Sequence, residues 1–404
     1  MQFSRQAIAF LMAFLSASLL YAGIAPTVED PLTNPGFVHF YNNEFDQAVT
    51  WFEQELKTHS DSPELYNHVA QGILYREMLR DGALESQLVS GNNPFLRRPK
   101  MEISAADKAR FDTCIDQTLK LTSAALAKDP HDIAALYAQG VAHGLRANYL
   151  FLVEKAWVEA LREATAARKA DQEIVSIDPS FIDARLLLGL NQYVVGALPF
   201  YMRALGFLGG FHGDKEAGIR ELELVAKSGV MNRYDAEVLL AAIYRRERKA
   251  QQAIPLLKDL AERFPRNYLL RFEQVQMYSD LGNKNSALQV LAEIDDLRTR
   301  GAPGYADLPL EKIKYLKGNL LFWYGDLDPA LTDLKEATRN ADKLDLNTAV
   351  LAWLRIGQTY DLQGNHQQAI GAYRETMKTA PKSQAATEAS TYISNPYRRK
   401  RSTG

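Results

Sequence analysis

The sequence is poor in cysteine, in net charge and in the motifs of known catalytic sites. Its 404 residues contain a single cysteine, Cys114, which excludes an intrachain disulfide and a cysteine-based zinc site. The formal net charge is −2, so the chain lacks the strongly basic balance that nucleic-acid binding requires. Hydrophobic residues make up 47% of the chain, which predicts a folded protein. Its stability must therefore come from packing.

Catalytic signatures are missing as well. Seven histidines are scattered along the chain, and none forms an HExxH motif or a close ligand pair with a carboxylate. The sequence contains neither a GxSxG turn nor a glycine-rich phosphate loop followed by Lys and Ser or Thr. Cys114 lies in an amphipathic stretch, where a buried structural thiol is expected. We predict a protein that is not an enzyme, with no catalytic residues, no cofactor and no metal site.

Residues 1–25 have the pattern of a targeting segment. Arg5 is their only charge, and an apolar run extends over residues 7–25 and ends in small residues. This pattern predicts a signal peptide. The run is also long enough to span a bilayer, so an uncleaved N-terminal anchor that contacts the membrane is the alternative. Both interpretations predict an exported protein, located in the periplasm or cell envelope.

The rest of the chain repeats with a period of 34 residues. Tyr244 and Tyr278 are separated by 34 positions. Ala287 and Ala330 are separated by 43, and the nine additional residues form an insert at 301–309, whose Gly and Pro residues mark it as a loop. A fixed period of this length is the signature of a repeat architecture, in which each unit buries its core only against its neighbours.

Four units carry a glycine followed by Asn or Asp at their centre. These pairs are Gly213-Asp214, Gly282-Asn283, Gly325-Asp326 and Gly364-Asn365. Glycine can adopt the left-handed conformation that ends one helix, and Asn or Asp can cap the next helix. Gly318 and Gly357 lie where two helices must approach closely, and Pro265 and Pro381 help to stop the second helix. Each unit is therefore predicted to be a helix, a tight turn and a second helix.

This pattern resembles the tetratricopeptide repeat, and the match is close between about residues 234 and 383. The resemblance implies an all-α fold, a right-handed superhelical solenoid of antiparallel helix pairs, with residues 234–383 as its regular array. One unit departs from the family, because Arg248 stands where the turn glycine belongs. Residues 384–404 supply a capping helix and a basic tail. Such a tail is usually disordered and solvated, and the alternative is contact with an acidic surface.

Residues 26–233 carry the same unit in a looser, divergent form. Two inserts interrupt them, at 82–104 and at 197–213; the first is rich in turn formers and the second is almost wholly apolar. Residues 181–230 resemble the tetratricopeptide-repeat-39 family, in which a comparable apolar segment precedes a Gly-Asp turn. We expect residues 26–395 to form one continuous stack of about seven helix pairs, irregular in its N-terminal half.

The resemblance also implies a binding groove. In this family the first helices line a concave surface that binds proteins or peptides, and the usual lining positions form a mixed aromatic and amide surface here. The candidate groove residues are Arg245, Arg246, Phe272, Gln276, Tyr315, Asn319, Phe322, Trp323 and Gln358. The alternative is that the aromatic residues among them pack against neighbouring units. The family's clamp for chaperone tails is not expected, since its repeated Lys, Asn and Arg are missing.

The apolar insert at 197–213 is the second candidate. As an exposed flap it would contact lipid or a partner through Phe200, Tyr201, Phe207 and Phe211. The favoured alternative is a plug that folds inward, because Pro and Gly residues break the insert into short pieces.

The sequence therefore predicts an exported, non-catalytic scaffold of the bacterial cell envelope that binds a protein or peptide partner and no nucleic acid. The alternative is a membrane-proximal protein that binds or handles lipid through residues 197–213. The sequence leaves the oligomeric state open.

Overall fold

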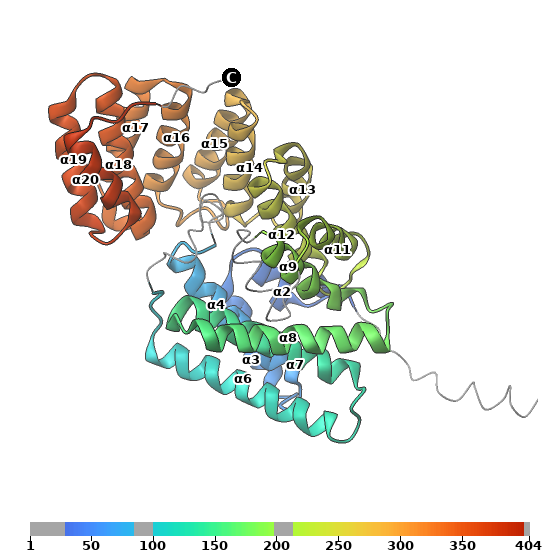
Figure 1. Ribbon diagram of the computed structural model, residues 1–404. Coiled ribbons are helices and arrows are strands. Elements are labelled where there is room, and N and C mark those ends of the chain that lie inside the picture. Colours follow the sequence, from blue (N-terminus) through green and yellow to red (C-terminus); the bar gives the residue numbers. More distant parts are fainter. Residues whose placement is uncertain (1–28, 85–99, 198–212, 400–404) are drawn as a thin grey trace, which may run out of the picture.

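The structure, a computed structural model, describes residues 29–84, 100–197 and 213–399. These ranges form 17 α-helices and no β-strand. Each helix packs against the next one along the chain, so that antiparallel pairs stack into a solenoid (Figure 1). The predicted all-α, repeat-like fold is therefore confirmed.

The N-terminal half contains four helix pairs of unequal length. In order they are α2 (Pro35–Tyr41) with α3 (Phe45–Leu56), α4 (Pro63–Arg80) with α6 (Ala105–Leu126), α7 (Ile133–Tyr149) with α8 (Trp157–Ile177), and α9 (Arg185–Gly196) with α11 (Lys215–Ser228). Short turns of other helix types flank them, namely η1 (Pro31–Thr33), η3 (Leu150–Glu154) and η4 (Ile182–Ala184). The two longest helices, α6 and α8, make this half irregular.

The C-terminal half contains four pairs of similar length and a final single helix. They are α12 (Arg233–Arg246) with α13 (Ala250–Arg263), α14 (Tyr268–Asp280) with α15 (Lys284–Thr299), α16 (Leu310–Tyr324) with α17 (Leu327–Thr338), α18 (Leu346–Leu362) with α19 (His366–Thr379), and α20 (Gln384–Ser394). A short turn, η5 (Ala341–Lys343), precedes α18. The described residues thus form eight pairs, one more than the sequence suggested.

The predicted turns have the expected backbone geometry. Gly282, Gly325 and Gly364 have φ values of 75°, 90° and 78°, the left-handed conformation that ends a helix. Arg248, which replaces the turn glycine in its unit, adopts the same conformation with φ of 58°. The turn therefore survives the loss of glycine, although a side chain makes this conformation less favourable.

The remaining glycine of this set, Gly213, behaves differently. Its φ lies outside the left-handed region, so that part of the prediction is wrong. Gly213 instead lies against α9, where an added Cβ would come within 2.3 Å of the backbone nitrogen of Gly196. The neighbouring Asp214 does cap α11, since its side chain accepts a hydrogen bond from the Ala217 amide. Asn283 caps α15 in the same way, through the Ser286 amide.

The helices of a pair approach closely at small residues, as predicted. A Cβ on Gly357 in α18 would lie 2.3 Å from Cε1 of Tyr373 in α19, and Tyr373 is completely buried. The same relation joins Gly318 in α16 to Leu334 in α17, with a Cβ to Cγ distance of 2.7 Å. Larger side chains on the second helix therefore occupy the space that glycine leaves on the first.

The N-terminal pair folds back onto the C-terminal half. The Tyr41 hydroxyl donates to Oδ2 of Asp235 at 2.9 Å, and the Tyr41 ring stacks on Phe264 with centroids 5.0 Å apart. Arg266 donates to Glu44 at 2.7 Å. These contacts join residues about 200 positions apart and place α2 beside α12 and the end of α13 (Figure 1).

The end of α4 reaches further along the same array. Leu79 and Leu84 pack against a core cluster that includes residues of α14, α15, α16 and α18. A Cβ on Gly82 would come within 3.0 Å of the Asp345 side chain, which precedes α18. The N-terminal helices therefore cover part of the surface that the repeat pattern alone would leave open.

Three predicted features fall outside the described residues. These are the targeting segment at 1–25, most of the insert at 82–104, and the flap residues Phe200, Tyr201, Phe207 and Phe211. Within the described ranges, no helix combines the length and the apolar character needed to cross a membrane.

Candidate functional site

The first helices of the C-terminal pairs share one face of the solenoid. Along this face α16 contacts α18, and α18 contacts α20. Side chains also bridge α12 to α14 there, as described below. We call the face formed by α12, α14, α16, α18 and α20 the inner surface. The predicted groove residues lie on four of these helices, α12, α14, α16 and α18, and their side chains have different surroundings.

Arg245 and Gln276 form one cluster, between α12 and α14. Arg245 lies 3.4 Å from Oε2 of Glu273, 3.4 Å from Oε1 of Gln276 and 3.7 Å from Oδ2 of Asp280. Its side chain is only 8% exposed. Burial raises the pKa of Asp280, while the charge of Arg245 opposes that rise. Arg245 is therefore engaged with carboxylates of its own chain and joins two helices.

Arg246, the next residue along α12, is exposed and leaves this cluster. Its guanidinium carbon lies 5.8 Å from the centroid of Tyr193, on α9. The two arginines of the predicted groove thus face different neighbours, because successive residues of a helix point about 100° apart.

Phe272 and Tyr315 belong to the core. Their exposed fractions are 5% and 3%, and both lie in the cluster that also contacts Leu79 of α4. The alternative interpretation, in which these aromatic rings pack against neighbouring elements, describes both of them.

The other four predicted residues gather around an arginine that the sequence did not single out. Nε of Arg355, on α18, donates to Oδ1 of Asn319 at 2.9 Å, and Nη1 donates to Oε1 of Gln358 at 2.6 Å. Its guanidinium carbon lies 4.4 Å from the centroid of Phe322 and 4.7 Å from that of Trp323. A planar guanidinium stacks well on aromatic rings, so the two rings orient the charge.

The exposure of these residues differs sharply. Phe322 is fully buried and Gln358 is 4% exposed, whereas Trp323 is 53% exposed. Arg355 is half-buried, and burial lowers the pKa of its guanidinium, although it stays charged. Among the described residues no carboxylate lies within ion-pair distance of Arg355, in contrast to Arg245. The inner surface therefore presents an exposed indole next to a cation whose hydrogen bonds, in the described part of the chain, go to two side-chain amides.

The sequence did not identify Arg355 because of its position in the repeat unit. It lies one residue after a lining position of the repeat, within the otherwise apolar stretch from Ala349 to Ile356. A lone arginine in such a stretch needs partners from other helices, and this signal could have identified it.

The segment that follows α20, as far as Arg399, lies against the same part of the inner surface. The buried carboxylate of Asp361 accepts hydrogen bonds from Nδ1 of His366 at 2.7 Å, from the Tyr373 hydroxyl at 2.6 Å and from the Tyr397 amide at 2.7 Å. Arg399 donates to the Phe322 carbonyl. The expectation of a disordered tail is therefore wrong as far as Arg399, because the last helix turns this segment back toward α18 and α16.

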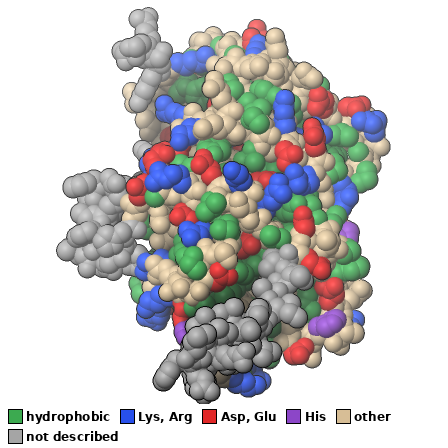
Figure 2. Space-filling view, turned by 90° about the vertical axis from the view of Figure 1, so that its right-hand side faces the viewer, with side chains coloured by type: hydrophobic (Ala, Val, Ile, Leu, Met, Phe, Trp, Pro, Cys, Tyr) green, Lys and Arg blue, Asp and Glu red, His purple; other side chains and the backbone are tan. Residues whose placement is uncertain are grey.

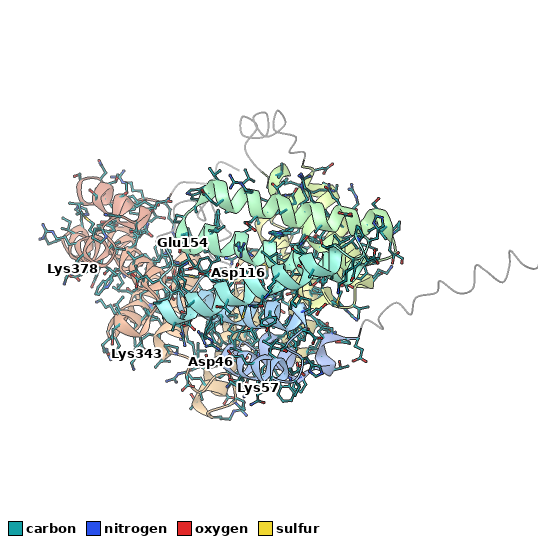
Figure 3. All side chains as sticks on the ribbon, turned by 90° about the horizontal axis from the view of Figure 1, so that it is seen from below. Asp46, Lys57, Asp116, Glu154, Lys343 and Lys378 are labelled. Atoms are coloured by element: carbon teal, nitrogen blue, oxygen red, sulfur yellow. The ribbon has the colours of Figure 1, made fainter. Side chains whose placement is uncertain are left out.

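The surface charge is mixed. Figure 2 shows acidic and basic side chains interspersed with hydrophobic ones on one face of the molecule. Many charges are paired; Asp46 lies 2.8 Å from Arg76, and Glu154 lies 3.2 Å from Lys108 (Figure 3). Such a surface suits a protein partner better than a polyanion.

No metal-binding constellation is present within the described ranges, since no three His, Cys, Asp or Glu side chains converge there. Cys114 is buried, and burial raises the pKa of its thiol to about 11, so the thiol is protonated at neutral pH. It behaves as a structural residue.

Comparison with known proteins identifies one unit of the array. Residues 351–383, which span most of α18 and α19, match the family model of the tetratricopeptide repeat. This model describes a repeat that is typically non-catalytic and binds proteins. No curated protein matches the chain, and the resemblance of residues 181–230 to the tetratricopeptide-repeat-39 family stays a prediction.

Several solved structures resemble the whole chain weakly. Yeast Tom70 is 11% identical with a TM-score of 0.40, covering 90% of this chain and 88% of its own. Cut9, in the Cut9–Hcn1 hetero-tetramer of APC/C, is 15% identical with a TM-score of 0.37, covering 89% and 74%. The human IFIT1 dimer with PPP-AAAA is 13% identical with a TM-score of 0.31, covering 85% and 89%. At these values the likenesses say nothing about function.

Proposed function

We propose that the protein is a non-catalytic scaffold that binds an extended segment of a partner protein on its inner surface, between α14 and α18. One observation carries the proposal: Trp323 is 53% exposed and stacks on Arg355, a cation whose hydrogen bonds within the described ranges go to Asn319 and Gln358. Exposed tryptophan and arginine are the side chains that most often dominate protein interfaces.

The chemistry of this spot suits a peptide. A tryptophan offers a large rigid contact area, while amide side chains and a guanidinium can bond the carbonyl groups of an extended backbone or an acidic side chain. The tetratricopeptide repeat at residues 351–383 supports the same proposal, since Arg355 and Gln358 lie on its first helix.

In this proposal the buried residues of the predicted groove support the inner surface and do not contact the partner. Phe272 and Tyr315 shape the inner surface from beneath, and Arg245 holds α12 against α14 through Glu273 and Asp280. We therefore restrict the contact residues to the exposed Trp323 and the half-buried amides Asn319 and Gln276.

A binding experiment with two matched tryptophan variants tests the proposal. Peptides selected on the purified protein from a display library should bind the Trp323→Ala variant about tenfold more weakly, or roughly 1.4 kcal/mol. Trp157 on α8 is also exposed, at 40%, so Trp157→Ala serves as the control and should bind normally. Equal binding by the wild type and both variants would rule out this part of the inner surface.

We also propose that the scaffold is exported to the bacterial cell envelope. The support is the apolar segment at 7–25 with its single preceding charge, Arg5. Fractionation of cells that express the full chain with a C-terminal tag tests this, and recovery of the tagged protein from the cytoplasm alone would contradict it.

A further inference from the structure

The segment that follows α20 runs back across the inner surface. Residues 395–399 are neither helix nor strand, and they pass the end of α18 and then the end of α16 (Figure 1). The Tyr397 amide donates to Asp361 at 2.7 Å. The Tyr397 ring lies 5.3 Å from the centroid of Tyr392 and 6.2 Å from that of Phe322. The main-chain amide and the side chain of Tyr397 are therefore both in contact with the rest of the protein.

Arg399 makes the next contact, two residues further on. Its guanidinium carbon lies 5.1 Å from the centroid of Phe322. Arg355 contacts the same ring. Arg399 also donates to the Phe322 carbonyl, in the last turn of α16. The same carbonyl also accepts a hydrogen bond from the Gly325 amide at 3.0 Å, so Arg399 supplies a second, charged donor near the negative end of the α16 dipole. Arg399 thereby joins this segment to the end of α16.

The spacing of these contacts is that of an extended peptide. Residues two apart in an extended chain lie on the same side, which brings Tyr397 and Arg399 to α16 together. Arg398 and Arg399 are both exposed, and it is Arg399 that contacts Phe322. A stretch of a few residues held by one main-chain bond and by alternate side chains is how peptide-binding domains hold their ligands.

We infer that the surface formed by Phe322, Gly325, Asp361 and Tyr392, here named the tail site, binds an extended peptide with an aromatic residue followed two positions later by arginine. The chain's own segment Pro396–Arg399 occupies this site as an intramolecular ligand. The inference rests on the proposed function and names the chemistry of the partner. It also makes the tail a competitor, which a partner segment of the same kind must displace.

The covalent link strengthens this competition. A segment joined to its own site has a high effective concentration, of the order of millimolar for short linkers. An external peptide therefore meets a site that is only fractionally free, and its apparent affinity falls by that fraction. The buried state of Phe322 is consistent with this, since Arg355 and Arg399 both lie over its ring.

Removal of the tail tests the inference directly. A variant that ends at Ser394 should bind a fluorescent peptide with the sequence of residues 393–401, and the full chain should bind it about tenfold more weakly or not at all. Tyr397→Ala or Arg399→Ala in the peptide should reduce binding to the truncated protein by about tenfold. Arg398→Ala is the matched control, because it removes the same charge from a neighbour that, within the described ranges, lacks the ring contact and hydrogen bond of Arg399, and it should bind normally.

Two results would overturn the inference. One is failure of the peptide to bind a truncated protein that is folded by circular dichroism. The other is equal loss of binding for Arg398→Ala and Arg399→Ala, which would mean attraction by net charge alone. If the truncated protein does not fold, the Tyr397→Ala variant of the full chain replaces it in the test. Amide exchange at residues 321–326 should then be faster than in the wild type, and addition of the peptide should restore the slower exchange. Unchanged exchange in this variant would also reject the tail site.

These outcomes are separable from the test of the proposed function. Selected peptides that need Trp323 for binding but compete with neither the tail nor its peptide would support the proposed function and reject the tail site. Binding of the tail peptide, together with normal binding of the selected peptides by Trp323→Ala, would support the tail site and reject the proposed role of Trp323.

Discussion

Asp361 connects three elements through one carboxylate. It accepts hydrogen bonds from His366 and Tyr373, both on α19, and from the Tyr397 amide beyond α20. A buried carboxylate is costly unless its oxygens are bonded, so the three donors define one arrangement of these elements. The tail supplies Asp361 with a partner that the repeat pattern does not predict.

His366 gives this arrangement a dependence on pH. Nδ1 of the ring lies 2.7 Å from Asp361, and Nε2 lies 3.1 Å from the Ile393 carbonyl at the end of α20. Only the imidazolium can donate from both nitrogens. The hydrogen bond to Asp361 accordingly raises the pKa of His366 above its ordinary value.

We predict that His366 titrates above about 6.5, measured from its ring proton shifts by NMR. Because the pKa is raised in the folded state, the charged ring stabilises the contact between α19 and α20 fully at pH below the unfolded value. This contribution is lost as the pH rises through the folded pKa. The Asp361→Asn variant should return the pKa toward its ordinary value, and an unshifted pKa in the wild-type protein would contradict the prediction.

At the scale of the element, the helix pair depends on the fit between one small and one large residue. Gly357 on α18 faces Tyr373 on α19, and the ring leaves no room for a Cβ. Tyr373 also donates its hydroxyl to Asp361, which restricts the movement of the ring. The contact therefore specifies how close the two helices lie.

We predict that Gly357→Ala lowers the free energy of unfolding by about 1–3 kcal/mol, since overpacking forces the helices apart. Gly371 in α19 is the matched control, because it is helical and exposed, and an added Cβ meets no atom within 4 Å. Gly371→Ala should raise the free energy of unfolding by about 0.5–1 kcal/mol through the higher helix propensity of alanine. Chemical denaturation measures both, and opposite signs are expected.

At the scale of the whole molecule, the solenoid is closed on its N-terminal side. Tyr41 and Glu44 bind Asp235 and Arg266, and the end of α4 packs on the core of the C-terminal pairs. Contacts between distant parts are unusual for a stack in which each unit touches only its neighbours. They hold the N-terminal helices against the array that carries the inner surface.

We predict that Arg266→Ala increases amide hydrogen exchange several-fold in residues 35–45 and 264–268, because it removes the bonds from Arg266 to both carboxylate oxygens of Glu44. Exchange in α18 and α19 should not change. Arg300→Ala is the control, since Arg300 pairs with Asp296 at 2.6 Å on the exposed surface and should affect neither region. A uniform increase throughout the chain would show that the fold loosens as one unit.

The sequence by itself determined the helix pairs of the C-terminal half, their turns and their close contacts. Period, turn glycines and small residues such as Gly357 act between neighbours in the chain, where local geometry follows from residue type. It also supplied the candidate residues, yet it could not separate the exposed Trp323 from the buried Phe322 beside it. Only the tertiary structure decided that Arg355 joins them, that Tyr41 closes the N-terminal side and that Tyr397 returns to Asp361. These contacts bring together residues from separate repeats or separate ends of the chain, and packing selects them without leaving a local pattern.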